Sequence, residues 1–224
     1  MSYKIEMHAH TAQSSPCSEL YADELISRYA DAGYAAVTIT DHLRLGYTVS
    51  AQDAASVQLQ KFLTGYEAAL CAGKRYGVKI YLGAELYFLQ TPQLEFLVYG
   101  ATEDFLYKSL AYLSGSIEDF YPFARENGVL VFCAHPFRYT DCPPDPAFVD
   151  GAEVYNAHPG QNSRNELGLQ YALDNGLMQV SGSDAHHPTH VARGGILADT
   201  LPEDAVELRQ LLLSGNYTLL RSES

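Results

Sequence analysis

Short apolar runs alternate with longer amphipathic stretches along the whole chain. The apolar runs are rich in Val, Ile and Tyr and are bounded by Gly or Asn, which is typical of buried strands. They predict seven strands: Tyr3–Met7, Ala35–Thr40, Lys79–Gly83, Glu95–Tyr99, Val129–Cys133, Gly151–Tyr155 and Leu177–Ser181. The stretches between them have helical periodicity. They predict five helices: Tyr21–Ala32, Asp53–Tyr76, Ile117–Asn127, Ser163–Asn175 and Pro202–Ser214.

Several of the predicted helices end at a glycine and are followed directly by a strand, as at Gly33, Gly77, Gly128 and Gly176. A helix, a glycine and a buried strand in regular succession are typical of repeated βα units around a mostly parallel sheet. Only Glu95–Tyr99 follows its predecessor without a helix, which indicates a hairpin or an excursion from the repeated pattern there. We therefore expect an α/β barrel, with an open doubly wound sheet as the alternative.

Length and composition support a compact domain. The chain has 224 residues, 47% of them hydrophobic, and no linker or low-complexity tract interrupts it. We expect a single domain over residues 1–224. The formal net charge of −13 argues against a nucleic-acid partner, because an acidic surface repels a phosphate backbone. Small anionic substrates stay compatible with this charge, since bound cations invert its sign locally.

Cysteine usage and the N-terminal sequence indicate a protein of the cytoplasm. The four cysteines lie far apart and form no CxxC pair, which favours free thiols in a reducing compartment. The first residues contain no apolar signal core, and no segment approaches the roughly 18 apolar residues of a membrane span. We expect no membrane association, and the sequence leaves the oligomeric state open.

The histidines are distributed in a way that packing alone does not explain. Each lies at, or shortly after, the C-terminal end of a predicted strand, where α/β barrels assemble their active sites. The eight are His8, His10, His42, His135, His158, His186, His187 and His190.

Two motifs place a pair of side chains two residues apart. His8-Ala9-His10 follows the first strand, and Asp184-Ala185-His186 follows the last. Residues i and i+2 of an extended segment point to the same side, so each pair can reach one ion. A single pair of this kind is as compatible with coincidence as with a metal site.

Three further groups lie at other strand ends: His42 in Asp41-His42, Glu85 in Gly83-Ala84-Glu85, and His135 in Ala134-His135-Pro136. Each has an ordinary alternative, such as a buried histidine or an ion-pair partner. Taken with the two pairs, they predict a site for divalent ions, because imidazole and carboxylate ligands suit zinc, manganese or iron. More ligands than one ion can use indicate two or three ions, which fits hydrolysis of a phosphoester by metal-activated water.

The ordered set of five motifs resembles the polymerase-and-histidinol-phosphatase (PHP) domain family, from His8 to about Gly195. The resemblance implies a distorted seven-stranded α/β barrel with a metal cluster at the strand ends, and phosphoesterase activity. It implies a first metal bound by His8, His10, Glu85 and Asp184, a second bound by Glu85 and His135, and a third bound by His42 and His186. It also implies catalytic roles for Asp184, on the attacking water, and for the bridging Glu85.

The chain departs from the family pattern at two places. Many members carry an Asp or His a few residues after the HxH pair, where this chain has Ser14-Ser15-Pro16-Cys17-Ser18. Many also carry a His in the strand after the bridging Glu, where this chain has Glu95–Tyr99. Whether Cys17 or Glu95 is a ligand is left open by the sequence.

Arg138 and Arg193 are the candidates for binding the substrate phosphate, because a guanidinium can contact phosphate with two parallel hydrogen bonds. Surface ion pairs are the alternative for both. We therefore expect a metal-dependent phosphoesterase that acts on a small phosphorylated metabolite. Histidinol-phosphate phosphatase, a carbon–nitrogen hydrolase and a metal-binding regulatory module without catalysis are the alternatives, and a proofreading exonuclease is disfavoured by the acidic charge.

Overall fold

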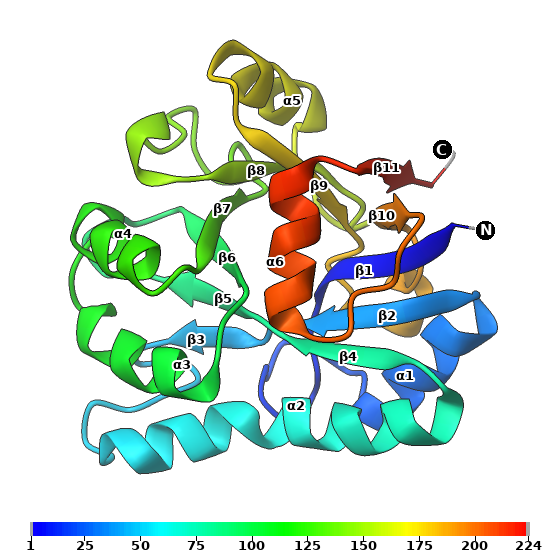
Figure 1. The fold of residues 1–224 in the computed structure, drawn as a ribbon. Helices are drawn as coiled ribbons and strands as arrows, with labels where there is room; N and C mark the ends of the chain where they lie inside the picture. Colours follow the sequence, from blue (N-terminus) through cyan, green and yellow to red (C-terminus); the bar gives the residue numbers. More distant parts are fainter. Residues whose placement is uncertain (1, 223–224) are drawn as a thin grey trace.

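The computed structural model describes residues 2–222 and contains eleven strands and six α-helices (Figure 1). The strands are β1 (Tyr3–Ala9), β2 (Tyr34–Ile39), β3 (His42–Arg44), β4 (Lys79–Leu82), β5 (Ala84–Tyr87), β6 (Glu95–Tyr99), β7 (Leu130–Ala134), β8 (Gly151–Asn156), β9 (Met178–Gly182), β10 (Gly194–Ala198) and β11 (Tyr217–Arg221). The helices are α1 (Ala22–Asp31), α2 (Ala55–Tyr76), α3 (Glu103–Ser109), α4 (Ile117–Glu126), α5 (Asn165–Asp174) and α6 (Ala205–Ser214).

The strands form two mixed sheets. One has the order β11-β10-β1-β2-β4 and the other the order β3-β5-β6-β7-β8-β9. The pairs β1–β2, β2–β4, β7–β8 and β8–β9 are parallel, whereas β6 pairs antiparallel with both β5 and β7. The α/β class is confirmed, and so is the hairpin expected at Glu95–Tyr99.

Each predicted strand coincides with an observed one to within a residue or two, and the four additional strands are β3, β5, β10 and β11. β3 and β5 follow β2 and β4 after short breaks, at Thr40-Asp41 and at Gly83. The seven-stranded closed barrel is not confirmed, because over residues 2–222 the backbone pairing gives five strands in one sheet and six in the other.

The two sheets meet at the C-terminal ends of their parallel strands. Thr40 N–H donates to the Ala9 carbonyl (3.0 Å), and Glu85 N–H donates to the Asp41 carbonyl (3.0 Å). On the other side of β1, Asp184 N–H donates to the His8 carbonyl (2.8 Å). These bonds join the strand ends that carry the predicted ligands, so the meeting of the sheets positions the site.

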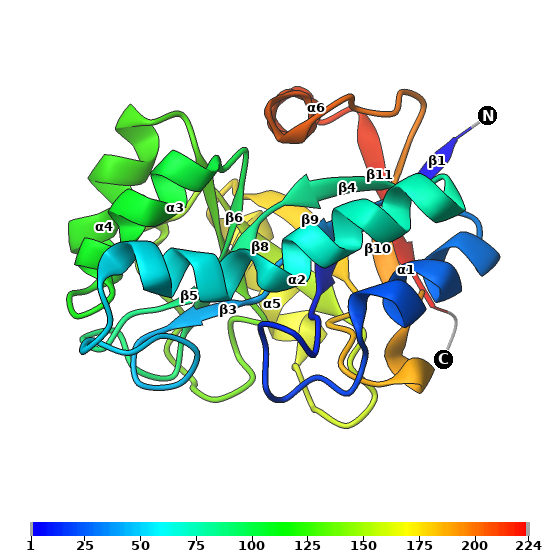
Figure 2. The ribbon, with the colours of Figure 1, turned by 90° about the horizontal axis from the view of Figure 1, so that it is seen from below.

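Helices cover the outside of the sheets. α1 and α2 lie side by side below β2 and β4, whereas α3 and α4 cover the sheet that contains β5 and β6 (Figure 1). Figure 2 shows the loops that follow β1, β7 and β8 on one side of the molecule and α6 on the opposite side. α6 packs Leu208, Leu211 and Leu212 into an apolar cluster with Tyr99 and Phe132. It therefore covers the end of the strands away from the predicted site.

Glycine is required where two backbones approach closely. Gly195 of β10 has φ of 133°, and a Cβ there would overlap the carbonyl of Ile5 on β1. At Gly194, a Cβ would overlap the backbone of Gly182 on β9. This close packing keeps β10 against β1 and next to β9. Among the described helices, none combines the length and apolar character that crossing a membrane requires.

Candidate metal centre

A cavity of about 370 Å³ opens at the meeting line of the two sheets. Five of the seven predicted metal ligands line it: His42, Glu85, His135, Asp184 and His186. The other two, His8 and His10, are fully buried behind Glu85 and Asp184 and contact both carboxylates. The structure therefore brings all seven predicted ligands to one place.

The HxH pair forms the deepest part of this centre. The Nε2 atoms of His8 and His10 are 3.0 Å apart, and each lies 3.3–3.5 Å from an oxygen of Glu85 and from Oδ1 of Asp184. His8, His10 and Glu85 each offer a ligand atom within 4.8 Å of the others. This arrangement can hold one ion between two imidazoles and two carboxylates.

Glu85 extends from this deep position to two more histidines. Its Oε1 lies 3.2 Å from His135 Nε2, and its Oε2 lies 2.9 Å from His42 Nδ1. Glu95, at the start of β6, also reaches this region, because its Oε2 lies 3.6 Å from His135 Nε2. Together with His42 and Glu85, Glu95 forms a further group with metal-ligand spacing.

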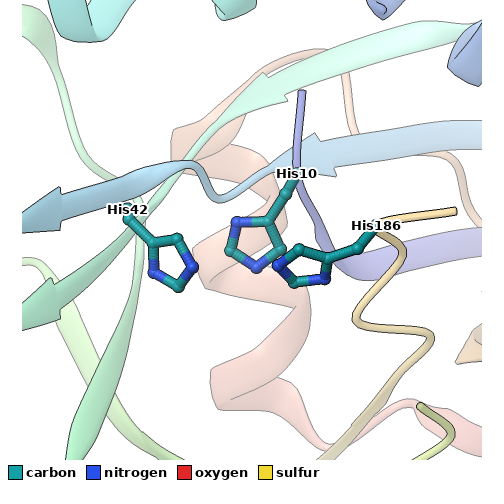
Figure 3. Close-up of side chains that lie close together, drawn as sticks. All are labelled: His10, His42 and His186. Carbon is teal, nitrogen blue, oxygen red and sulfur yellow. The ribbon is translucent and has the colours of Figure 1, made fainter. Parts of the chain in front are cut away.

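A third group consists of His10, His42 and His186, whose rings point toward one another (Figure 3). Cys17 lines the cavity beside His186 and His42. Burial raises the pKa of this thiol, but the influence of these two histidines outweighs burial and lowers the pKa to about 6. The loop after the HxH pair therefore brings a thiol with a lowered pKa to the cavity.

Asp41 fixes the loop that carries Cys17. Its carboxylate is buried and accepts hydrogen bonds from Thr11 N–H, Thr11 Oγ1 and Ser15 Oγ, each at 2.7 Å. Ser15 Oγ in turn lies 3.4 Å from Nδ1 of His10. In the Asp41-His42 motif, Asp41 thus fixes the neighbouring loop through hydrogen bonds, whereas His42 lines the cavity.

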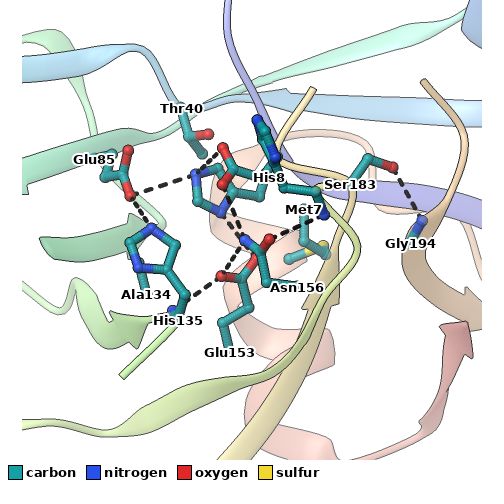
Figure 4. A network of polar contacts seen from close by, with 12 residues as sticks. Met7, His8, Thr40, Glu85, Ala134, His135, Glu153, Asn156, Ser183 and Gly194 are labelled. Atoms are coloured by element: carbon teal, nitrogen blue, oxygen red, sulfur yellow. Dashed lines mark hydrogen bonds and ion pairs between the residues drawn. The ribbon is translucent and has the colours of Figure 1, made fainter. Parts of the chain in front are cut away.

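Glu153 was not found by sequence reasoning. It lies on β8, is 1% exposed, and its Oε1 is 2.8 Å from His8 Nδ1 (Figure 4). Its Oε2 accepts from the N–H of His135 (3.0 Å) and from Asn156 Nδ2 (2.9 Å). In a neutral ring, a carboxylate that accepts from Nδ1–H leaves Nε2 unprotonated, which is the form that binds a metal. Glu153 therefore orients the ring of His8, whose Nε2 lies near Glu85 and Asp184.

The two arginine candidates have different surroundings. Arg138 lines the cavity, and its Nη2 donates to Asp184 Oδ2 (2.8 Å) and to Asn156 Oδ1 (2.6 Å). Arg193 is not among the residues that line the cavity, and its Nε is buried without a hydrogen-bond partner among the described residues. Of the two, only Arg138 is brought to the centre.

Two of the predicted ligands have backbone conformations that L-residues rarely adopt. His135 has φ of 28° and Asp184 has φ of 51°. Such conformations cost of order 1–3 kcal/mol each and are found where a side chain must be aimed in a fixed direction. Both residues come immediately or shortly after a strand end, and both aim their side chains at the cluster.

The charges of the cluster fit divalent cations. Burial raises the pKa of Glu85 and Asp184, but nearby His8 and, respectively, His42 and Arg138 outweigh it and hold both pKa values well below the ordinary range. The two carboxylates are therefore ionised. The histidines supply neutral donor atoms once their protons are displaced, and this donor set suits zinc, manganese or iron.

The family model of the PHP domain matches residues 6–208, and the chain therefore belongs to the PHP domain family. No curated protein matches the sequence. Three solved structures have the same fold at low identity. One is a two-domain protein from Bacteroides vulgatus containing a predicted PHP-like metal-dependent phosphoesterase, with a TM-score of 0.67, 15% identity and 99% coverage of this chain. This chain spans 65% of the length of that protein.

The second is PsfC from Pseudomonas syringae, with a TM-score of 0.68, 16% identity, and coverage of 99% of this chain and 92% of PsfC. The third is an amidohydrolase from Chromobacterium violaceum with bound sulfate, with a TM-score of 0.60, 17% identity, and coverage of 96% and 97%. At these identities the likeness establishes a shared fold.

Proposed function

We propose that this protein is a metal-dependent phosphoesterase that hydrolyses a small phosphorylated metabolite. The observation that carries the proposal is the convergence of two carboxylates and five histidines from five separate strand ends at one cavity. Membership of the PHP family and the phosphoesterase named among the structural neighbours support it. We also propose that residues 1–224 act as one catalytic domain, and that its two joined sheets are a distorted form of the expected barrel.

The ligand assignment is part of this proposal. His8, His10, Glu85 and Asp184 would hold a first ion, Glu85 and His135 a second, and His42 and His186 a third. Bound divalent ions would polarise a water molecule and neutralise the charge of the phosphoester oxygens. Glu95 would complete the second position, and Cys17 the third, where this chain departs from the family pattern; the distance of Glu95 from His135 and the influence of His42 and His186 on Cys17 support this.

The remaining side chains bind and orient. Arg138 presents a cation beside Asp184, and its Nη1 has no partner among the described residues, so it is available to a phosphate oxygen. Asp184 Oδ2 is held by Arg138 and by Asn156 Nδ2 (3.1 Å), which leaves Oδ1 facing His8 and His10. We propose that Oδ1 orients the attacking water and accepts its proton.

The test is a comparison of the purified protein with the variant His8→Ala/His10→Ala. Both are loaded with manganese or zinc and assayed on phosphomonoesters and phosphodiesters. The wild type should turn over only with metal, and the double variant should lose at least about a hundredfold of kcat/KM, because the deepest ion loses two ligands. His187→Ala, at an exposed histidine of the rim, is the matched control and should retain activity. Metal-independent turnover, or a fully active double variant, contradicts the proposal.

Two rival functions are separated by the same assay. The amidohydrolase among the structural neighbours makes carbon–nitrogen hydrolysis the second candidate. An amide panel run beside the phosphoester panel, with histidinol phosphate included in the latter, discriminates these reactions. Stoichiometric metal binding without turnover on either panel would instead identify a metal-binding regulatory module.

A further inference from the structure

A second group of histidines lies at the mouth of the cavity, next to the proposed metal centre. His158, His186 and His190 offer ligand atoms within 4.8 Å of one another, and all three line the cavity. The rings of His158 and His190 are 4.3 Å apart in an edge-on arrangement. By spacing alone this group could be another metal site or a set of hydrogen-bond donors.

The hydrogen bonds of the rings decide between these two uses. A ligand histidine donates from one ring nitrogen to the protein and thereby leaves the other nitrogen free to bind metal. His8 follows this rule through Glu153, and His186 follows it because its Nδ1 lies 2.9 Å from the Asp184 carbonyl, which can only accept. For these two histidines the free atom is Nε2.

His158 has the opposite arrangement. The backbone N–H of Gly160 donates to His158 Nδ1 (3.1 Å), and a backbone N–H cannot accept. Nδ1 must therefore be unprotonated, and in the neutral ring the proton resides on Nε2. An imidazolium carries N–H on both nitrogens, so a ring that accepts at Nδ1 is neutral.

His190 has the same tautomer through a longer bond. The N–H of His186 donates to its Nδ1 (3.4 Å), so this nitrogen is also unprotonated. His158 and His190 both line the cavity, and in this tautomer each carries its N–H group on Nε2. Within residues 2–222, the Nε2 of His158 has no protein acceptor.

His158 is also fixed in place by the residues that hold Asp184. Its backbone N–H donates to Asn156 Oδ1 (3.1 Å), the same atom that accepts from Arg138 Nη2. Asn156 Nδ2 in turn donates to Asp184 (3.1 Å). Asn156 therefore links the backbone of His158 to both Arg138 and Asp184 at the proposed reaction centre.

We propose that His158, assisted by His190, is a neutral N–H donor that binds an oxygen of the substrate's phosphoryl group at the cavity mouth. This inference rests on the proposed phosphoesterase function and adds a substrate-binding residue to it. The donor carries no charge, so it adds no repulsion toward the nearby ions. It complements Arg138, most of whose donors are already used by the protein.

The experiment compares His158→Phe, which removes the donor but keeps a flat ring, with His158→Gln, whose amide N–H replaces Nε2–H. Metal-loaded full-length protein is assayed with p-nitrophenyl phosphate, and binding of inorganic phosphate is measured by calorimetry. His158→Phe should raise KM and the phosphate dissociation constant about tenfold, because a hydrogen bond to a charged oxygen is lost, with kcat within about twofold. His158→Gln should recover most of the loss.

The metal content of both variants, measured by elemental analysis, should equal that of the wild type. Loss of one ion in His158→Phe and His158→Gln would make His158 a ligand and overturn the donor assignment. Unchanged KM and phosphate affinity would overturn it as well, as would failure of the wild type to bind phosphate.

His187→Phe, at the same rim, is the control for ring substitution. Wild-type turnover tests the phosphoesterase function, and the dependence of phosphate binding on His158 tests this inference separately.

Discussion

At the scale of single residues, the centre combines side chains that we propose to bind ions with groups that fix the protonation state of those side chains. Glu153 and the Asp184 carbonyl hold protons on the Nδ1 atoms of His8 and His186, whereas Gly160 N–H keeps Nδ1 of His158 unprotonated. Histidines that look alike in the sequence therefore differ in which ring nitrogen carries the proton. The hydrogen bond at Nδ1 determines this. The division follows from backbone and carboxylate positions that only the fold provides.

Cys17 is the residue whose role can be decided most directly. We expect Cys17 to be a thiolate ligand of the ion that His42 and His186 would hold, because all three residues line the same cavity and the two histidines lower the pKa of the thiol to about 6. Replacing the native metal with Co²⁺ should then produce a thiolate-to-cobalt charge-transfer band in the near ultraviolet. Cys17→Ser should abolish this band and weaken binding of the last ion about 10–100-fold, as loss of a metal ligand or its support typically does.

Two exposed cysteines provide the controls for this measurement. Cys142→Ser and Cys71→Ser remove thiols that lie outside the cavity, and both proteins should keep the cobalt band. A band that survives in Cys17→Ser, or its absence from the wild type at full cobalt occupancy, would show that Cys17 does not coordinate.

The predicted ligands were accessible from the sequence because each stands at a strand end, where the apolar pattern stops. Glu153 gave no such signal. It lies inside β8, in Gly151–Asn156, and a charged residue within an apolar strand reads as an exposed position. Its burial and pairing come from long-range neighbours such as His8 on β1, which lies 145 residues away in sequence. Long-range pairing of this kind is not contained in local periodicity.

At the scale of elements, the predicted strands also have a local sequence signal, whereas additional strands such as β10 and β11 depend on contacts between distant segments. Buried parallel strands such as β2 and β7 form uninterrupted apolar runs. β10 begins with two glycines and β11 is only half-buried, so neither has that pattern. β10 is positioned by close backbone contacts with β1 and β9, and β11 pairs with β10, which a sequence pattern does not reveal.

Helix α2 is held against the loop that carries Cys17 by a glycine. Gly65 N–H donates to Ser14 Oγ (2.8 Å), and a Cβ at Gly65 would overlap Thr11 Oγ1 and lie 2.5 Å from Asp41 Oδ2. Helix propensity alone predicts that Gly65→Ala stabilises the protein by about 1 kcal/mol. We expect the opposite sign, a destabilisation of roughly 1–3 kcal/mol, because the methyl group must displace the buried loop.

Denaturant unfolding of the metal-free protein measures this effect. Thr64→Ala, at the exposed neighbouring position of α2, is the control and should change the free energy of unfolding by less than about 0.5 kcal/mol. Gly65→Ala should also weaken binding of the ion near Cys17, since Asp41 and Thr11 fix that loop. A higher free energy of unfolding for Gly65→Ala than for the wild type would contradict this prediction, because it would show that the loop can move aside without loss of stability.

At the scale of the whole molecule, folding gathers negatively charged side chains at the metal centre. Their mutual repulsion and burial oppose folding unless positive charge is present. The chain has a formal net charge of −13, and folding buries Glu85, Glu153 and Asp184 around one cavity. Without ions, these carboxylates hold the pKa of His8 well above its ordinary value against the opposing effect of burial. Glu85 does the same for His42. Protons on these two histidines thus partly replace the ions, and metal binding must displace them.

Removal of metal should therefore lower the melting temperature in a pH-dependent way. Ions that bind only the folded chain stabilise it by about 2.7 kcal/mol at a hundredfold excess over Kd. For a chain of this size that corresponds to a shift of roughly 5–10 °C between the metal-loaded and EDTA-treated protein. The shift should shrink from pH 8 to pH 6, because protons that remain on His8 and His42 at the lower pH compete with the ions.

The His8→Ala/His10→Ala variant should show a smaller shift at both pH values. Thermal unfolding at fixed free metal checks both statements, and a wild-type shift that is absent, or that grows as the pH falls, would contradict this account of how metal and protons share the centre.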